Sequence, residues 1–583
     1  MKNLNSKNLW VIIAIILLSS CTNLQKMKKN AGLIQFTTTP AMLETHAGKT
    51  DVAINLNFPK KYFIKTATMT ATPVLTYANG ETALPAILLQ GDQIRANNRV
   101  ISYTNGGTIN YNQSFAFQDA MRKSELVMKM TATKGKKSLD FEAVPLAKGI
   151  LATSTLLANL PKVLLGIRRE ANTTGVYDPA IDPFQRIVPQ EMVADIAYLI
   201  NSSELRKSES NSDAMKNYLD YTKGAVKDDK KQVKKVEVVA YASPDGTLDL
   251  NADLASKREK VSTRFLEGEL KEAELLEKIR TKYMPEDWEG FKQLMEKSTI
   301  QDKDLILRVL AMYTDPDVRE TQIKNLTETF TQIKDEILPK LRRAKLYTSV
   351  EIIGKTDEEI LALAESNPGS LNQAELLHAA TLVDDLSRKL KIYQSFIRIF
   401  PEDWRGHNNA GWVLSQQFKY AEAKPFFEQA ARLKATEPII KNNLGAVALT
   451  ENNLTQAEEF FGIAAGVGDE VRYNLGLVSF RKGDYSKAIT YFEGMQDPNT
   501  ALAKIMTGNY PGALRDLESF QRPNCYMKEY LKAIIGARTN DDKLFSESLT
   551  KALTYNPEWK AKASTDMEFA KYFGDSRFQE ITR

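Results

Sequence analysis

Two residues of opposite charge stand thirteen positions apart in the segment 233–265, and their types suit a ligand that carries both charges. Asp245 belongs to the Ser-Pro-Asp-Gly turn at 243–246, and Arg258 belongs to a stretch with helical periodicity. A guanidinium binds a carboxylate through two parallel hydrogen bonds, while a carboxylate on the opposite wall would complement an ammonium. The predicted chemistry is therefore non-covalent recognition, and losing one charged contact would weaken it about ten- to a hundred-fold.

A strand, a turn and a helix must position these two charges. β-branched residues between 236 and 239 suit a buried strand, and the proline and glycine of the turn favour a tight reversal. The amphipathic helix after the turn would carry Arg258, so that backbone forms the floor of a pocket and a cation forms one wall. An alternative interpretation leaves Arg258 on the exposed side of this helix, paired with Asp245, Asp249 or Glu259.

The spacing of the polar residues around the turn follows a pattern found in one family. Gly246, Asn251, Leu254 and Arg258 match its glycine, asparagine, leucine and arginine, and Ser243 stands where the family has an aspartate. The segment thus resembles the OmpA-like peptidoglycan-binding domain. The resemblance implies that Arg258 and an aspartate grip the zwitterionic diaminopimelate end of the peptidoglycan stem peptide, with Asp245 as the candidate replacement. The site residues it implies are Tyr241, Ser243, Asp245, Asn251 and Arg258.

The order of the neighbouring elements extends this resemblance over residues 191–355. A strand is expected at 196–200, a first helix at 213–225 and a last strand at 347–353, the last preceded by the Leu-Arg-Arg-Ala sequence at 341–344. Residues 268–338 show long helical periodicity and are predicted to be a helical insertion.

The first 21 residues combine a basic start, a short apolar run and small residues before a cysteine. Leu9–Leu18 is too short to span a membrane, and Leu18-Ser19-Ser20-Cys21 resembles the lipobox of bacterial lipoproteins. The resemblance implies a signal peptide at 1–20, lipidation of Cys21 and a lipidated tether at 21–32. Thr22, where an aspartate can retain lipoproteins at an inner membrane, favours the outer membrane, and the basic residues after it favour the periplasmic face.

Composition places the chain among globular proteins with several domains. It has 583 residues, of which 43% are hydrophobic and 26% are charged, and its net charge is +5. The short basic runs are expected to be solvated, so no nucleic-acid partner is predicted. With Cys21 lipidated, Cys525 remains as a structural thiol and no intramolecular disulfide is expected.

The sequence contains no recognisable catalytic or metal-binding spacing. His46, His378 and His407 lie in three separate regions, and the zinc-protease, CxxC, nucleophile-elbow and P-loop patterns do not occur. We therefore expect no enzyme activity, no metal and no cofactor.

Residues 33–150 are predicted to form a β-sandwich of immunoglobulin-like size. Apolar residues alternate with polar ones at 52–58 and 126–132, and glycine turn signals lie at 79–80, 105–107 and 134–135. This domain is expected to mediate contacts with envelope proteins. A mixed connector is expected at 151–190, ending in a proline-marked segment.

Small and aromatic residues recur at fixed spacing in the C-terminal part. Ala410, Leu444 and Leu475 each precede a glycine, and each is followed by an alanine after thirteen residues and an aromatic residue after seventeen. This pattern resembles the tetratricopeptide repeat (TPR), with small residues where helices cross and large ones between repeats. It predicts five to six helix pairs over 357–583.

TPR solenoids commonly hold a peptide or a partner helix in a concave groove. Asparagine pairs stand at corresponding places in two repeats, which resembles the groove-lining asparagines of peptide-binding TPRs. The alternative is that they are ordinary polar positions that recur with the repeat. The predicted groove residues are Asn408, Asn409, Trp412, Asn442, Asn443, Arg472 and Asn474.

Together these features predict a multidomain α+β protein with an N-terminal β-sandwich, a central OmpA-like α/β sandwich with a helical insertion, and a C-terminal all-α TPR solenoid. The predicted function is an outer-membrane lipoprotein of Bacteroidota type that serves as a non-catalytic tether or scaffold. Its OmpA-like domain would contact peptidoglycan and its repeats would bind protein partners. The alternative function is an accessory subunit of an outer-membrane secretion or assembly machine, in which the OmpA-like fold has lost its ligand.

Overall fold

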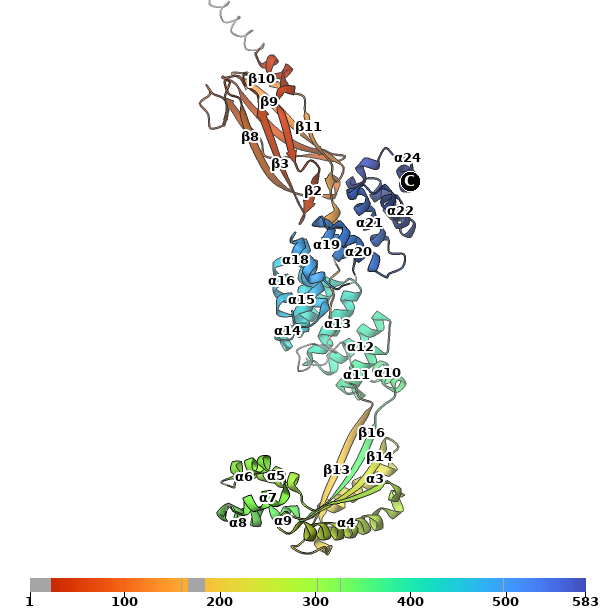
Figure 1. Ribbon diagram of the computed structural model, residues 1–583. Coiled ribbons are helices and arrows are strands. Elements are labelled where there is room, and N and C mark those ends of the chain that lie inside the picture. The colour runs from red at the N-terminus through yellow and green to blue at the C-terminus, as the bar shows by residue number, and fades with distance from the viewer. Residues whose placement is uncertain (1–22, 159, 166–183, 301, 326, 496) are drawn as a thin grey trace, which may run out of the picture. The chain divides into compact units, whose positions relative to one another are not determined.

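The computed structural model describes residues 23–158, 160–165, 184–300, 302–325, 327–495 and 497–583 (Figure 1). These residues form two compact units, one composed of Met1–Ile181 and Asp385–Arg583 and the other of Asp182–Asp384. The second unit is therefore inserted in the sequence of the first. Among the described residues, no helix is both long and apolar enough to span a membrane.

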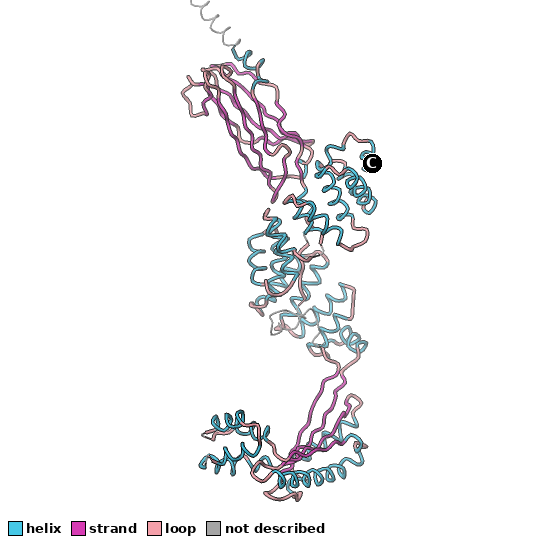
Figure 2. The backbone as a smooth tube through the Cα atoms, in the orientation of Figure 1, coloured by secondary structure: helices cyan, strands magenta, loops and turns pink. Residues whose placement is uncertain are grey.

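The N-terminal part of the first unit consists of two β-sheets (Figure 2). One sheet has the order β1-β3-β2-β12 with β8 on β3, and the other has the order β10-β9-β4-β6-β7 with β11 on β9 and β5 on β4. The strands are β1 (Gln35–Thr39), β2 (Leu43–His46), β3 (Lys49–Phe58), β4 (Thr68–Tyr77), β5 (Gly80–Ala83), β6 (Ile87–Gly91), β7 (Arg99–Ile101), β8 (Gly107–Ala116), β9 (Ser124–Lys134), β10 (Lys137–Asp140), β11 (Val144–Lys148) and β12 (Ile150–Leu151).

Alternation along the strands supplies the core of this β-rich part. The apolar residues of β3 at positions 52–58 and of β9 at positions 126–132 are buried in one cluster. Their polar neighbours are turned the other way, since successive side chains of a strand point to opposite faces. The prediction that the N-terminal region is β-rich is confirmed.

The C-terminal part of the first unit is an array of helix pairs. Its helices are α12 (Leu386–Ile399), α13 (Trp404–Gln416), α14 (Tyr420–Leu433), α15 (Pro438–Thr450), α16 (Leu454–Ile463), α17 (Asp469–Arg481), α18 (Tyr485–Phe492), α19 (Pro498–Met506), α20 (Tyr510–Ser519), α21 (Tyr526–Thr539), α22 (Asp542–Tyr555), α23 (Lys560–Ala563) and α24 (Ser576–Thr582). The array of this unit begins at α12, whereas the sequence placed the start of the repeats at 357.

Glycine allows the two helices of a repeat to pack closely. A Cβ atom on Gly445 of α15 would lie 2.7 Å from the ring of Phe461 of α16. The same relation holds for Gly411 with Phe427, at 2.6 Å. Because no real Cβ contact is so short, the spacing of glycine and phenylalanine in the sequence records where the helices cross.

The second unit is built on a four-stranded sheet with the order β13-β16-β14-β15. Its strands are β13 (Ile187–Ala197), β14 (Lys231–Tyr241), β15 (Ile279–Met284) and β16 (Arg343–Ile353). β14 and β15 are parallel, and the other neighbours are antiparallel. Its helices are α2 (Lys207–Ser210), α3 (Asp213–Lys227), α4 (Leu248–Leu270), α5 (Trp288–Lys297), α6 (Lys303–Met312), α7 (Pro316–Lys324), α8 (Thr327–Glu336), α9 (Leu338–Leu341), α10 (Asp357–Ser366) and α11 (Gln373–Thr381).

Two predicted boundaries of this unit are wrong. The first strand begins at Ile187, inside the predicted connector, rather than at 196. The predicted helical insertion at 268–338 contains β15, which extends the central sheet by pairing with β14. The helices that follow β15 have a core of their own, which includes Phe291 and Met295.

Candidate functional site

Described residues of the predicted connector, 157–158 and 160–165, lie against the first helices of the repeats, where asparagine side chains of the predicted groove bind their backbone. Asn443 accepts a hydrogen bond from the amide of Leu164 and donates one to its carbonyl, both at 2.7 Å. Asn474 makes the same pair of bonds to Lys162, both at 2.8 Å. Asn499 binds Ala158 in this way at 3.0 and 3.1 Å. Each side-chain amide thus pairs with one residue as a neighbouring β-strand would.

Further asparagines support these three. Asn408 donates to the Leu164 carbonyl at 3.0 Å, and Asn442 donates to the Lys162 carbonyl at 2.9 Å. Asn443 donates to Asn408, and Asn474 donates to Asn442, each at 2.9 Å. All of these side chains are buried, and the hydrogen bonds orient each amide toward the connector.

The connector's own side chains add a few apolar and charged contacts. Leu157 and Leu164 are buried in the core of the helical array, whereas Leu160 is 55% exposed. The ammonium of Lys162 lies 4.4 Å from the centre of the Tyr473 ring. Burial raises the pKa of the nearby Asp497, and the positive charge of Lys162 opposes this shift.

The structure separates the seven predicted groove residues into two sets. Asn408, Asn442, Asn443 and Asn474 bind the connector, and Asn409 accepts a hydrogen bond from Asn408 at 3.2 Å. Trp412 instead lies 5.8 Å beneath the ammonium of Lys389, and Arg472 pairs with Asp469 at 3.0 Å and with the carbonyl of Glu493 at 2.9 Å.

We expected a peptide or a partner helix at these asparagines, and in the structure they bind Ala158, Lys162 and Leu164 of the same chain. Sequence reasoning also missed Asn499, which lies twenty-five residues after Asn474. The shortened spacing of the later repeats hid it, although its place near the start of a first helix was a usable signal.

The predicted site of the second unit is a pocket of about 190 Å³ between the 243–246 turn, the start of α4 and the beginning of β16. Four of the five predicted residues line it or its rim. Its polar lining is Asn201, Ser243, Asp245, Asn251, Arg258 and Arg342. The pocket therefore holds one carboxylate and two guanidinium groups.

Arg258 is buried, with 1% of its surface exposed, and it binds three backbone carbonyls. It donates to Ser202 at 2.9 Å, to Tyr241 at 2.8 Å and to Leu199 at 3.2 Å. Its guanidinium also lies 5.2 Å from the centre of the Tyr198 ring. The interpretation of Arg258 as an exposed helix residue paired with a carboxylate is therefore wrong. Burial lowers its pKa to about 10.

Asp245 pairs with Arg342, a residue that the sequence did not single out for this site. The two side chains are 3.2 Å apart, Ser243 donates to Asp245, and Arg342 donates to the Ser243 hydroxyl at 3.1 Å. Ser243 and Asp245 thus both accept hydrogen bonds from the Arg342 guanidinium.

Asn251 and Tyr241 support the walls of this pocket. Asn251 donates to the Gly246 carbonyl at 3.0 Å and to Glu286 at 3.1 Å, which joins the turn to α4 and to the loop after β15. Tyr241 contributes its carbonyl to Arg258, and burial raises the pKa of its phenol.

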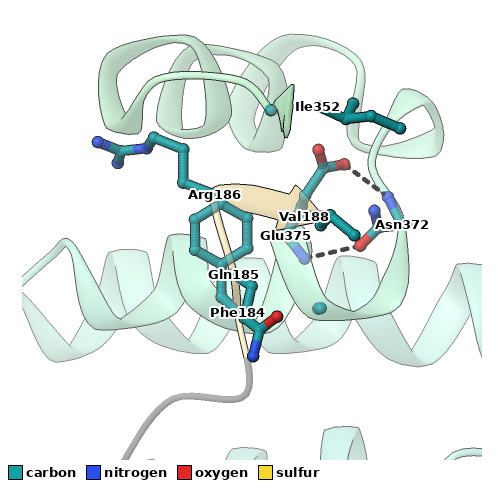
Figure 3. Close-up of a pocket in the computed structure, with 9 residues that line it drawn as sticks. Phe184, Gln185, Arg186, Val188, Ile352, Asn372 and Glu375 are labelled. Atoms are coloured by element: carbon teal, nitrogen blue, oxygen red, sulfur yellow. Dashed lines mark hydrogen bonds between the residues drawn. The ribbon is translucent and has the colours of Figure 1, made fainter. Parts of the chain in front are cut away.

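A second pocket of the same unit, of about 420 Å³, lies beside the first residues of β13 (Figure 3). Phe184, Val188 and Ile352 give it an apolar lining, and Arg186 and Glu375 stand at its polar part. The reciprocal hydrogen bonds between Asn372 and Glu375 cap α11, as the dashed lines of Figure 3 show. This helix cap accounts for two of the polar groups around the pocket.

The remaining predicted site lies outside the described residues, since Cys21 falls in 1–22. Cys525 is a free, half-buried thiol at the N-terminal end of α21. Within the described ranges, no group of three or more histidine, cysteine, aspartate or glutamate side chains is arranged to hold a metal ion.

Comparison with known proteins confirms the repeats. The tetratricopeptide repeat family model matches residues 405–437 and 469–494. No curated protein matches the chain. The TPR protein YrrB, described as having an unusual peptide-binding site, is similar at 19% identity, with a TM-score of 0.25, over 28% of this chain and 93% of that one.

Two further solved structures each match about two fifths of the chain. A TPR protein from Parabacteroides merdae is 16% identical over 40% of this chain and 94% of that one, with a TM-score of 0.28. PilF of Pseudomonas aeruginosa is 15% identical over 38% of this chain and 100% of that one, with a TM-score of 0.29. The family match identifies TPR repeats within the C-terminal helices, and such repeats are typical of protein–protein interaction scaffolds.

Proposed function

We propose that this protein is a non-catalytic scaffold of a Gram-negative envelope of Bacteroidota type, anchored in the outer membrane by lipid on Cys21 and facing the periplasm. Its second unit is an OmpA-like domain that binds peptidoglycan in the 190 Å³ pocket, and its TPR part recruits envelope proteins. The observation that carries the proposal is the mixed charge of this pocket, where Asp245, Arg258 and Arg342 converge.

The charges of the pocket suit a zwitterion such as the diaminopimelate end of a stem peptide. A guanidinium has five N–H donors, and three hydrogen bonds from Arg258 to carbonyls leave two of them for a ligand carboxylate. Arg342 lies on the same pocket and adds a second cation. Asp245 is the carboxylate that binds the ligand ammonium, and this contact replaces part of its ion pair with Arg342.

Membrane anchoring makes a weak wall site sufficient. A lipid-anchored chain holds the pocket near the wall, so that the second contact forms at high effective concentration. The anchor itself is tested by detergent-phase partitioning of Cys21→Ala, which should leave the membrane fraction. Unchanged membrane association of this variant would contradict the lipoprotein assignment.

Sedimentation of the full chain with purified peptidoglycan tests the pocket. Asp245→Asn keeps the shape of the side chain and removes its charge, so it should weaken sedimentation about tenfold. Asp249→Asn is the matched control, because this aspartate is exposed in the first turn of α4, and it should bind like the wild type. Arg258→Ala is the less informative variant, since it also removes the donor of three carbonyls.

A specific observation also favours the second candidate function, an accessory scaffold of a secretion or assembly machine. Asp245 is already paired with Arg342, and Arg258 already binds three carbonyls, so the polar groups of the pocket are partly satisfied without a ligand. A folded wild-type chain that does not sediment with peptidoglycan would support this function over the tether. Affinity purification from envelope extracts would then identify the machine.

A further inference from the structure

The asparagine-lined groove recognises its occupant mainly through the backbone. Ala158, Lys162 and Leu164 each offer an amide and a carbonyl to one asparagine, and these six hydrogen bonds do not depend on side chains. Residues 162 and 164 are two apart, so their backbone groups point the same way in an extended segment. Any extended segment of suitable length can make this set of bonds.

Side-chain contacts narrow the choice of segment. At position 164 the groove buries a leucine, and at position 162 it places a cation over Tyr473 with the half-buried Asp497 nearby. Val163, which lies between these two positions, is only half-buried, and Leu160 is exposed. The groove therefore favours a cation two residues before a leucine and tolerates variation at exposed positions such as 158 and 160.

Apart from the buried Leu157, Pro161 and Leu164, the described connector residues are held mainly through their backbone. The side chains of Ala158, Leu160 and Lys162 are exposed, and the described part of the segment pairs with no β-strand. Its occupancy benefits from being part of the same chain, because a tethered segment needs little intrinsic affinity to fill its site. A free segment with better contacts can therefore compete for the same asparagines.

We propose that residues 157–158 and 160–165 are a built-in competitor for the TPR groove. In cis they occupy it, and they are displaced in trans by an extended segment of a protein partner that carries a cation two residues before a leucine. Partner binding then releases these residues from the asparagines. This goes beyond the proposed wall contact and does not depend on it, since it concerns the first unit alone.

The test uses the full chain and a fluorescent synthetic peptide corresponding to residues 155–165. Leu164→Glu places a charge in an apolar site and should empty the groove without altering the asparagines. The peptide should bind this variant at least tenfold more tightly than the wild type, as measured by fluorescence anisotropy. Leu160→Glu, a change at an exposed position of the same segment, should behave like the wild type.

Two further measurements identify the site at which the peptide binds. Adding Asn443→Ala to Leu164→Glu should abolish peptide binding, and a peptide with proline at position 162 should not bind because it lacks the amide that Asn474 accepts. A folded Leu164→Glu chain that does not bind the peptide would overturn the proposal, and so would equal affinity for the wild type. A dimer in which two copies exchange connectors would show that a second copy of this chain, rather than a different protein, displaces the connector. That result would overturn the proposal of a different protein as partner.

Hydrogen exchange of the wild type gives a measurement that needs no variant. If the connector is displaceable, the amides of Lys162 and Leu164 exchange at least a hundred-fold faster than core amides of the repeats, such as that of Phe461. Exchange at the rate of the core amides would show that the segment is a permanent part of the fold and would overturn the proposal.

Discussion

Replacing Lys162 by proline and, separately, by alanine would distinguish recognition of the connector's backbone from recognition of its side chain. Both variants lose the ammonium that lies 4.4 Å from the Tyr473 ring. Only the proline variant also loses the amide that donates to Asn474 at 2.8 Å. Proline is tolerated in extended backbone, so the variant changes little else in the segment.

The structure sets the size of the two effects. An exposed cation–π contact contributes about 0.5–1 kcal/mol, so the alanine variant should open the connector roughly two- to fivefold more often. Loss of the amide leaves the buried side-chain oxygen of Asn474 without this donor, which costs about 1–3 kcal/mol more. The connector of the proline variant should therefore open roughly five- to 150-fold more often than that of the alanine variant. The proline variant should therefore be the more open of the two.

Hydrogen exchange at the Leu164 amide measures this opening, because that amide is bound by Asn443 and is present in both variants. Exchange should accelerate moderately with alanine and strongly with proline. Equal acceleration in the two variants would refute the reasoning that the asparagines read the backbone. Amides in β9, remote from the groove in sequence, serve as the internal control.

Three other predictions concern buried or half-buried ionisable side chains, and hydrogen exchange or thermal melting checks each of them. Arg258→Met should destabilise the second unit by at least about 3 kcal/mol, because three carbonyls lose their donor, and α4 should exchange faster. Arg538 pairs with Glu44 at 2.6 Å and with Glu568, and burial raises the pKa of Glu568. Without this cation, the folded state of Arg538→Met favours a protonated Glu568, so the melting temperature of the variant should fall as the pH rises above 5. Burial lowers the pKa of His407, so the wild type should lose stability as the pH falls below about 6.5, and His407→Gln should lose less.

Each of these predictions has an outcome that would contradict it. Unchanged exchange in α4 of Arg258→Met would mean that water replaces the guanidinium at no cost. A pH-independent melting temperature of Arg538→Met would mean that Glu568 finds another cation. Equal acid sensitivity of His407→Gln and the wild type would assign that sensitivity to other groups.

The repeats were predictable because their sequence signal is local. Glycine and phenylalanine stand at a fixed spacing since a Cβ atom on Gly476 would lie 2.4 Å from the ring of Phe492. The asparagines were predictable for the same reason, as they recur with the unit. Their occupant was not, because residues 157–164 carry no periodic pattern and take their conformation from asparagines several hundred residues later.

The sheet of the second unit shows where pattern reasoning fails. β15 and the first half of β13 are mostly exposed edge strands, so burial imposes no alternation on their sequences. Arg258 lines the pocket, but its acceptors at Leu199 and Ser202 lie almost sixty residues earlier in the sequence. No local sequence pattern could indicate that these carbonyls accept hydrogen bonds from the Arg258 guanidinium.

The pairing of β13 with β16 brings together the two ends of the sheet-bearing part of the second unit, residues 187–353, since Ile187 lies opposite Ile353. Partners in an antiparallel pair have Cα atoms about 5 Å apart, which two or three residues can bridge. Residues 187–353 can therefore be excised and replaced by a short linker without separating the flanking residues 186 and 354. Such a module could be gained, lost or exchanged for another domain during evolution, while the repeats and the clasped connector keep their covalent path.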